Sequence, residues 1–196
     1  MGTVKSLLLG MCFVLGACTS QTSTVQTTEK GTQWEWQNGT IVVKTPERPA
    51  GQKSVLGLTT PKLEAVRVGF VGLGMRGPGA VERFTYIPGT QVVALCDYEE
   101  ARADKCQELL KKASMPKAAV YSGDKGYEEL CKRDDIDLVY IAADWLHHFP
   151  VAMCAMENGK NVAIEVPSAM NLKECWALVD MSEKLSLIHI SEPTRH

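Results

Sequence analysis

The sequence lacks several features that would point to common classes of protein. Positive and negative side chains almost cancel, giving a net charge of −2 in 196 residues, so nothing predicts a nucleic-acid partner. No apolar run reaches the roughly 18 residues that a membrane-spanning helix needs. None of the seven cysteines is spaced as C-x-x-C, so we expect neither a metal site nor a redox pair. Hydrophobic residues make up 45% of the chain and charged residues 22%, which is typical of a globular protein.

The first 18 residues resemble the signal peptide of a bacterial lipoprotein. Lys5 supplies a basic start, and an apolar segment over 7–17 ends in the stretch Leu15-Gly16-Ala17-Cys18. The apolar segment has the length of a signal peptide and is too short to cross a membrane. We therefore expect cleavage before Cys18, whose lipid would anchor the protein in the bacterial cell envelope, at the outer membrane or in the periplasm. The alternative is an ordinary secretory peptide in which Cys18 has no role.

Composition divides the rest of the chain into three parts. Residues 19–63 are rich first in Thr, Ser and Gln and then in Pro and Gly, which predicts a flexible tether followed by an irregular arm. Residues 64–184 alternate between apolar strands and amphipathic helices, as in a parallel sheet with helices on both faces. The expected strands cover 66–71, 90–96, 119–121, 138–143 and 161–164. The first expected helix follows the first strand and ends near 84, and the others cover 99–113, 127–132, 149–158 and 172–184.

Residues 185–196 do not fit this pattern. They resemble the translation of a sequencing adapter, so we expect them not to be native, the alternative being a genuine short tail. The fold class that we predict is α/β, a Rossmann-type doubly wound parallel sheet. We expect a second α/β domain, which would bind the substrate, to be missing from this chain.

A glycine-rich turn follows the first expected strand. Gly72, Gly74 and Gly77 have the spacing G-x-G-x-x-G after residues 66–71. In a dinucleotide-binding unit the first glycine permits a tight turn, the second lets a diphosphate approach the backbone, and the third lets the next helix lie close to the sheet. The helix start also favours a diphosphate, because its free N–H groups carry partial positive charge. The alternative is an ordinary glycine-rich loop.

The second expected strand ends at an acidic residue. Residues 90–96 are apolar and rich in valine, and Asp97 follows them, twenty residues after the last of the three glycines. A carboxylate at this place binds the adenosine ribose and repels a 2′-phosphate, which predicts NAD as the cofactor. Tyr98 comes next rather than an arginine, but Arg76 and Arg102 leave NADP open. The alternative for Asp97 is a turn at the strand end or the N-cap of the next helix.

Three segments together resemble one family of proteins. They are Gly72-Leu73-Gly74-Met75-Arg76-Gly77, Ala142-Ala143-Asp144-Trp145-Leu146-His147-His148 and Gly159-Lys160-Asn161-Val162-Ala163-Ile164-Glu165-Val166-Pro167. Over residues 66–184 the chain resembles the glucose–fructose oxidoreductase and inositol dehydrogenase superfamily. Within that superfamily it is most similar to glycoside hydrolase family 109, the NAD-dependent α-N-acetylgalactosaminidases, which are often exported lipoproteins.

Val166 favours the hydrolase family over the dehydrogenases. Sugar dehydrogenases of the superfamily carry Glu-Lys-Pro where this chain has Glu165-Val166-Pro167, and their lysine assists hydride transfer. Trp145 also matches the Thr-Pro-Trp-x-x-His segment of the hydrolases. Ala143 and Asp144 depart from its Thr-Pro, so the resemblance leaves the shape of this loop open.

The resemblance implies a cofactor-binding role for each site residue. Met75 and Arg76 would contact the phosphates through the backbone, and Asp97 would bind the ribose. The loop Trp145, Leu146, His147 and His148 would lie over the cofactor, with Glu165 and Val166 near the nicotinamide ribose. Each of these side chains also has a purely structural alternative. Trp145 could pack as an aromatic on the sheet edge, and His147 could face solvent. His148 could be the start of a helix, and Glu165 could cap the turn after its strand.

The same resemblance implies hydrolysis of α-N-acetylgalactosaminides with NAD as a catalyst. NAD would oxidise the sugar at C3, which acidifies the C2 proton; the aglycone would leave C1, water would add, and the hydride would return to C3. A pair of glycosidase carboxylates is therefore not expected. The family's catalytic tyrosine and histidine correspond to positions beyond Lys184, so the catalytic residues are unknown and we expect this chain to be inactive alone.

Two other functions stay open from the sequence. One is a sugar or polyol dehydrogenase that uses NAD, and the other is a dinucleotide-binding fragment without catalysis. The expected partner is a glycan that contains N-acetylgalactosamine. We expect no nucleic-acid partner, and we expect contact with a membrane only through the lipid on Cys18. The sequence is also compatible with an oligomer.

Overall fold

The computed structural model describes residues 26–27, 33–43, 47–187 and 189–191. They divide between two compact units, Met1–Thr45 and Pro46–His196. The expected signal peptide with Cys18, and most of the expected tether, lie outside the described residues. Among the helices that the structure describes, none is long and apolar enough to cross a membrane.

The first unit contains a small antiparallel sheet. Strands β1 (Gln26–Thr27), β2 (Gln33–Gln37) and β3 (Thr40–Val43) pair in this order. Asn38 and Gly39 join β2 to β3 with φ values of 50° and 78°. Positive φ at both central residues defines a type I′ hairpin turn, for which Asn-Gly is the preferred sequence. The prediction of a tether and irregular arm throughout 19–63 is therefore wrong for these strands, because the Asn-Gly turn brings β2 and β3 together although the sequence shows no clear strand period.

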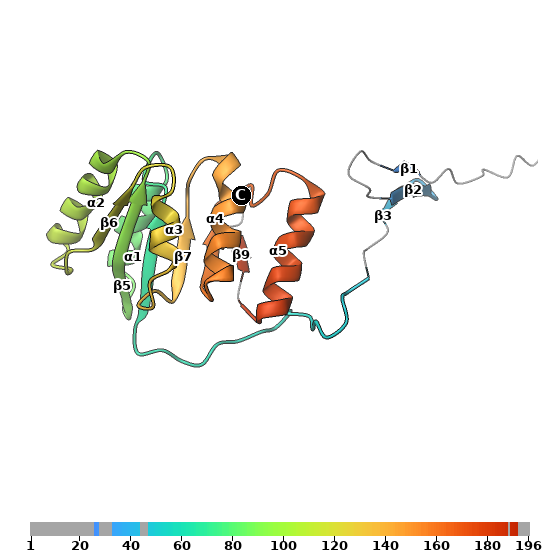
Figure 1. Ribbon diagram of the computed structural model, residues 1–196, viewed down its shortest axis with the longest axis horizontal. Coiled ribbons are helices and arrows are strands. Elements are labelled where there is room, and N and C mark those ends of the chain that lie inside the picture. Colours follow the sequence, from blue (N-terminus) through green and yellow to red (C-terminus); the bar gives the residue numbers. More distant parts are fainter. Residues whose placement is uncertain (1–25, 28–32, 44–46, 188, 192–196) are drawn as a thin grey trace, which may run out of the picture. The chain divides into compact units, whose positions relative to one another are not determined.

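The second unit is built on a six-stranded sheet in which every neighbouring pair is parallel (Figure 1). Its spatial order is β6-β5-β4-β7-β8-β9. This is the 3-2-1-4-5-6 order of the doubly wound Rossmann fold, so the predicted fold class is confirmed. The strands are β4 (Val66–Val71), β5 (Thr90–Asp97), β6 (Ala119–Ser122), β7 (Leu138–Ile141), β8 (Asn161–Ile164) and β9 (His189–Ser191).

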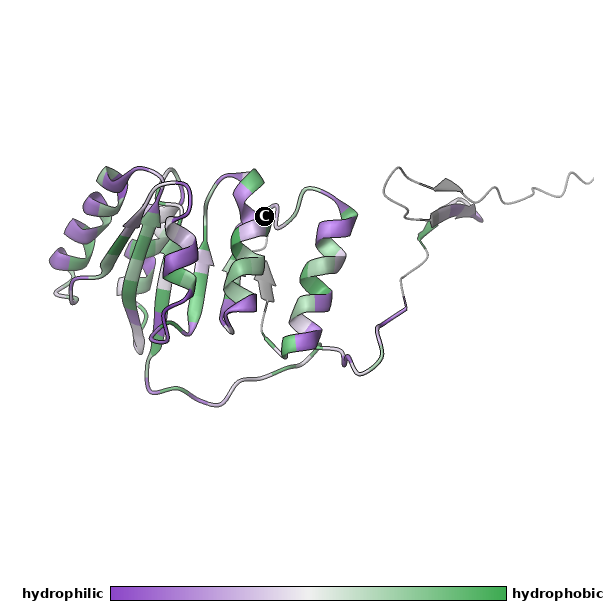
Figure 2. Ribbon diagram, viewed as in Figure 1, coloured by the Kyte–Doolittle hydropathy of each residue, from purple (hydrophilic) through white to green (hydrophobic). Residues whose placement is uncertain are grey.

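Helices cover both faces of this sheet and produce two hydrophobic cores. Residues of α1 (Gly77–Thr85) and α2 (Glu100–Lys112) pack with Phe70 and Leu95 on one face. Residues of α3 (Gly126–Cys131), α4 (Trp145–Glu157) and α5 (Leu172–Leu185) pack with Val71 and Ile141 on the other. Burial on both faces explains why the strands are apolar almost throughout, as the green strands of Figure 2 show.

Two elements differ from the sequence-based expectation. Helix α4 begins at Trp145 instead of 149, because the side chain of Asp144 caps it and Pro150 is accommodated inside the helix. Strand β9 lies within the segment 185–196 that the sequence predicted to be non-native, and it pairs with β8. The structure thus gives part of this segment a place at the edge of the sheet.

An extended segment, residues 47–65, contains no helix or strand and contacts α5. Arg48 donates two hydrogen bonds to the buried carboxylate of Glu183, at 2.6 and 2.9 Å. The side-chain amide of Gln52 donates to the carbonyl of Asp180 at 3.0 Å. These contacts hold the segment along α5 before it enters β4.

Candidate functional site

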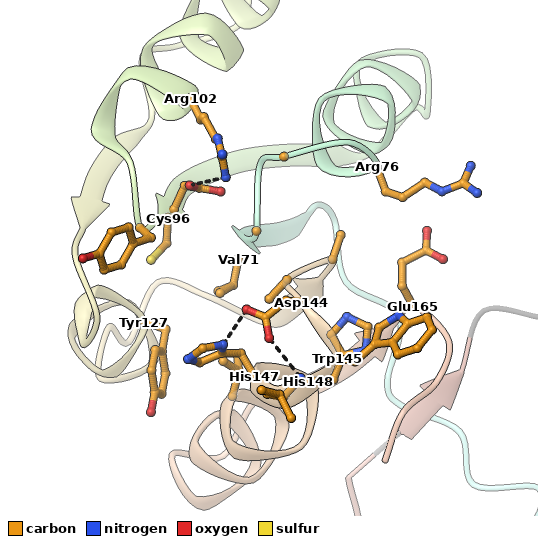
Figure 3. A pocket seen from close by; sticks show the side chains of 18 of the residues that line it. Val71, Arg76, Cys96, Arg102, Tyr127, Asp144, Trp145, His147, His148 and Glu165 are labelled. Atoms are coloured by element: carbon orange, nitrogen blue, oxygen red, sulfur yellow. Dashed lines mark hydrogen bonds and ion pairs between the residues drawn. The ribbon is translucent and has the colours of Figure 1, made fainter. Parts of the chain in front are cut away.

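A cleft of about 910 Å³ opens at the carboxyl ends of the parallel strands. Val71 at the end of β4 and Ala142 after β7 both line it. The strand order reverses between β4 and β7, and in open α/β sheets ligands bind at such a switch point. The volume lies in the range of pockets that hold small molecules and cofactors. Figure 3 shows the side chains that converge on this cleft.

The glycine turn between β4 and α1 forms one wall of the cleft. Gly72 has a φ of +92°, and a Cβ there would lie 2.3 Å from the backbone nitrogen of Ala143. A Cβ at Gly77 would lie 2.1 Å from the carbonyl oxygen of Gly72, so α1 packs directly on the turn. A Cβ at Gly74 would meet only the end of the Arg102 side chain, at 3.7 Å. Packing within the protein therefore explains the first and third glycines, and the second leaves space beside the backbone for a ligand.

The start of α1 is suited to a diphosphate. The N-cap residue Arg76 makes no side-chain capping bond, and no acidic residue lies in the first turn. The first backbone N–H groups of a helix have no partner inside the helix, and they carry partial positive charge. Met75 beside them is 97% exposed, so the described residues leave its side chain uncovered.

Asp97 at the end of β5 links the glycine turn to the start of α2. One carboxylate oxygen accepts a hydrogen bond from the backbone N–H of Leu73 at 2.6 Å. The other accepts from the backbone N–H of Glu99 at 3.0 Å and from the guanidinium of Arg102 at 3.3 Å. Protein donors thus occupy three of the roughly four acceptor positions of a carboxylate, which leaves one for a ribose hydroxyl. Asp97 serves as a turn residue and also faces the cleft, so its two predicted roles are compatible.

The residues expected to form a loop over the cofactor are the first turn of α4. This corrects the prediction for Trp145, Leu146, His147 and His148. Asp144 caps the turn by accepting a hydrogen bond from the N–H of Leu146 at 2.9 Å. Its other oxygen lies 2.5 Å from Nδ1 of His147. Burial alone would raise the pKa of Asp144, but the bonds from His147 and Leu146 hold it below its usual value.

His148 presents an unpaired nitrogen at the cleft. Its ring is buried, and Nδ1 lies 2.8 Å from the carbonyl oxygen of Pro167. Because a carbonyl only accepts, Nδ1 donates to it, and in a neutral ring Nε2 is then an acceptor. Nε2 is buried and has no partner among the residues that the structure describes. A ligand N–H or O–H would satisfy this atom.

Glu165 and Val166 follow β8 at the far end of the cleft. Glu165 accepts a hydrogen bond from the hydroxyl of Tyr140 at 3.0 Å. Val166 is 40% exposed and Trp145 is 61% exposed, and both line the cleft. Figure 3 shows Trp145 and Glu165 on the side of the cleft where Arg76 lies, away from Arg102.

The structure brings together all of the predicted site residues except Gly77, which packs beneath the turn. The binding role of each stays a prediction. Sequence reasoning did not place Asp144, Asp124 and Tyr127 at the cleft. The position of Asp144 before an apolar helical stretch is an N-cap signal, whereas only the fold brings α3 and the loop before it to this cleft. No group of His, Cys, Asp or Glu in the described part of the chain could hold a metal ion.

Comparison with known proteins places this cleft in context. Residues 66–192 match a family model described as an oxidoreductase family with an NAD-binding Rossmann fold. Glycosyl hydrolase family 109 protein 5 of Phocaeicola vulgatus is 76% identical over 186 residues, which cover 94% of this chain and 36% of that protein. The chain therefore spans little more than a third of the length of this relative.

Solved structures show the same fold. The myo-inositol dehydrogenase of Lactobacillus casei, in complex with NAD(H) and myo-inositol, matches 65% of this chain and 36% of its own, with a TM-score of 0.56 and 24% identity. The biliverdin reductase of Synechocystis, in complex with biliverdin and NADP⁺, matches 65% of this chain and 37% of its own, with a TM-score of 0.56 and 25% identity.

Proposed function

The chain belongs to the oxidoreductase family with an NAD-binding Rossmann fold, and from this premise we propose that it is the cofactor-binding part of a family 109 glycoside hydrolase. The observation that carries this proposal is Val166 at the cleft. A valine has no proton to give or take, so it cannot assist hydride transfer from an alcohol as the lysine of the sugar dehydrogenases does. The family name of the 76% identical relative supports the same function.

The family supports a dinucleotide, and we propose that it is NAD. When bound, NAD supplies a reversible hydride acceptor through which a sugar hydroxyl is transiently oxidised and restored. The residues of the cleft fit this group. The N–H groups at the start of α1 and the open space at Gly74 would hold the diphosphate, and Asp97 would accept a ribose hydroxyl. The buried Nε2 of His148 would accept one hydrogen bond from the cofactor.

The proposed substrate is an α-N-acetylgalactosaminide, and the proposed setting is the cell envelope, with a lipid on Cys18. The cleft residues bind and orient; none of them is assigned the proton transfers of the reaction. We propose that these steps need residues in the part of the relatives that this chain does not match. The 196-residue chain is therefore expected to bind NAD without hydrolysing glycosides.

Two assays test the proposal. The purified chain is titrated with NAD, and it is then incubated with p-nitrophenyl α-N-acetylgalactosaminide and NAD. Saturable binding without release of p-nitrophenol is expected, and no binding at all would overturn the proposed cofactor role. In the second assay, residues 66–184 replace the matching segment of the Phocaeicola vulgatus relative.

This chimeric protein is expected to release p-nitrophenol and to produce no net NADH. Net NADH with free N-acetylgalactosamine or inositol would instead show a dehydrogenase. A Val166→Ala chimera is the control for the role of this position, and it should keep the hydrolase reaction because only the absence of a titratable group matters there.

A further inference from the structure

We propose that the Glu99–Arg102 ion pair makes the adenosine end of the cleft select NAD against NADP. The proposal rests on the proposed cofactor-binding function and adds the residues that discriminate between the two dinucleotides. Asp97 alone does not settle this choice, because Arg102 lies against it and an arginine is well suited to bind a 2′-phosphate.

The guanidinium of Arg102 lies beside the carboxylate that is proposed to bind the adenosine ribose. One of its nitrogens lies 3.3 Å from the carboxylate of Asp97 and 3.7 Å from the place of a Cβ on Gly74. A ribose whose hydroxyl reaches the remaining acceptor position of Asp97 would lie against this guanidinium, so Arg102 borders the 2′ position. Figure 3 shows Arg102 reaching into this end of the cleft while Arg76 extends away on the opposite side.

Glu99 holds Arg102 from the solvent side. The second guanidinium nitrogen of Arg102 donates to Glu99 at 2.9 Å, one helical turn away. Two carboxylates, Asp97 and Glu99, thus surround one guanidinium, and the three groups together carry a formal charge of −1. A 2′-phosphate brings about two more negative charges to this place, whereas the 2′-hydroxyl of NAD brings none.

The charge of Glu99 can be removed with little effect on the fold. Its side chain is 58% exposed and 42% of the Arg102 side chain is exposed, so exchange of Glu99 for glutamine leaves the packing unchanged. The group then becomes neutral, and Arg102 is free to turn toward a 2′-phosphate. Glu129, which pairs with Lys132 at the same sequence spacing on α3 and is 63% exposed, provides a matched control away from the cleft.

The test compares the Kd values for NAD and NADP of the 196-residue chain and three variants, by calorimetry in low salt. Glu99→Gln should raise the affinity for NADP relative to NAD by about fivefold, which corresponds to about 1 kcal/mol. Glu129→Gln should leave the ratio at the wild-type value. The gain should shrink in 0.5 M salt, because exposed charges are screened.

Addition of Arg102→Gln to the Glu99→Gln variant should abolish the gain. An unchanged ratio in Glu99→Gln, or a gain that persists in the double variant, would overturn the proposal. Both results differ from failure of the proposed function, in which the wild-type chain binds neither dinucleotide.

Discussion

The same substitution at two glycines of one turn should have opposite consequences. Gly72→Ala places a methyl group 2.3 Å from backbone atoms at the end of β7 and forces alanine to a φ of +92°. A left-handed conformation costs about 1–2 kcal/mol and overpacking about 1–3 kcal/mol, so we expect a loss of about 2–5 kcal/mol in the free energy of unfolding. For a unit of this size that loss lowers Tm by about 2–4 °C per kcal/mol.

Gly74→Ala should leave the fold intact and weaken cofactor binding. Its methyl group would meet only the flexible end of Arg102, at an ordinary contact distance. We expect Tm to stay within about 2 °C of the wild-type value, since an unstrained exchange of glycine for alanine changes stability by less than about 1 kcal/mol. The methyl group would fill the space assigned to the diphosphate, and loss of one charge-assisted hydrogen bond of about 1.5–3 kcal/mol weakens NAD binding at least about tenfold.

Thermal unfolding and calorimetric NAD titration of both variants check this pair of expectations. The reasoning about the turn fails if Gly72→Ala unfolds at the wild-type temperature. The assignment of the diphosphate site fails if Gly74→Ala binds NAD as tightly as the wild-type chain does.

Three further predictions use other parts of the second unit. Two hydrogen bonds from the side chain of Arg67 lower the pKa of Asp137, so the ionised carboxylate stabilises the fold above about pH 4, and this contribution is lost as Asp137 is protonated at lower pH. Asp137→Asn should lower the free energy of unfolding by about 1 kcal/mol and remove much of this pH dependence, as acid unfolding of the variant and the wild-type chain would show. Burial raises the pKa of Cys96 to about 12, so iodoacetamide at pH 8 should label the exposed Cys175 before Cys96, as mass spectrometry of the native chain would show. Asp144→Ala removes the cap of α4 and should cost about 1 kcal/mol in urea unfolding, and an unchanged midpoint would contradict the capping role.

The sheet could be predicted from the sequence because its signals are local. A run such as Leu138–Ile141 is apolar throughout, and the glycine turn at Gly72 marks the end of the strand Val66–Val71. The parallel order follows from the alternation of strands and helices, because such connections are right-handed and cannot cross. The residues at the carboxyl ends of the strands must then meet at one edge, which is why the predicted site residues lie together.

The remaining features depend on contacts between distant segments. Tyr127 reaches the cleft because α3 packs beside α4, and Arg48 pairs with Glu183 across more than a hundred residues. Neither the packing of α3 beside α4 nor the pairing of Arg48 with Glu183 follows from a period or a fixed spacing in the sequence. The hairpin at Asn38-Gly39 does have a local signal, the Asn-Gly pair at its turn, but its strands are too short to show a clear alternation of apolar and polar residues.

Asp144 shows how a departure from a family pattern acts in the structure. The resemblance has Thr-Pro before the tryptophan, and a proline there fixes the backbone without offering a side-chain acceptor. Asp144 offers two oxygens, one for the N–H of Leu146 and one for the ring of His147. Helix α4 therefore starts at Trp145, and the segment that we propose to face the cofactor is the first turn of a helix instead of a loop. This turn places His148 in the lining of the cleft with its Nε2 buried and without a partner among the described residues, and a donor from a bound cofactor is the partner that we propose for it.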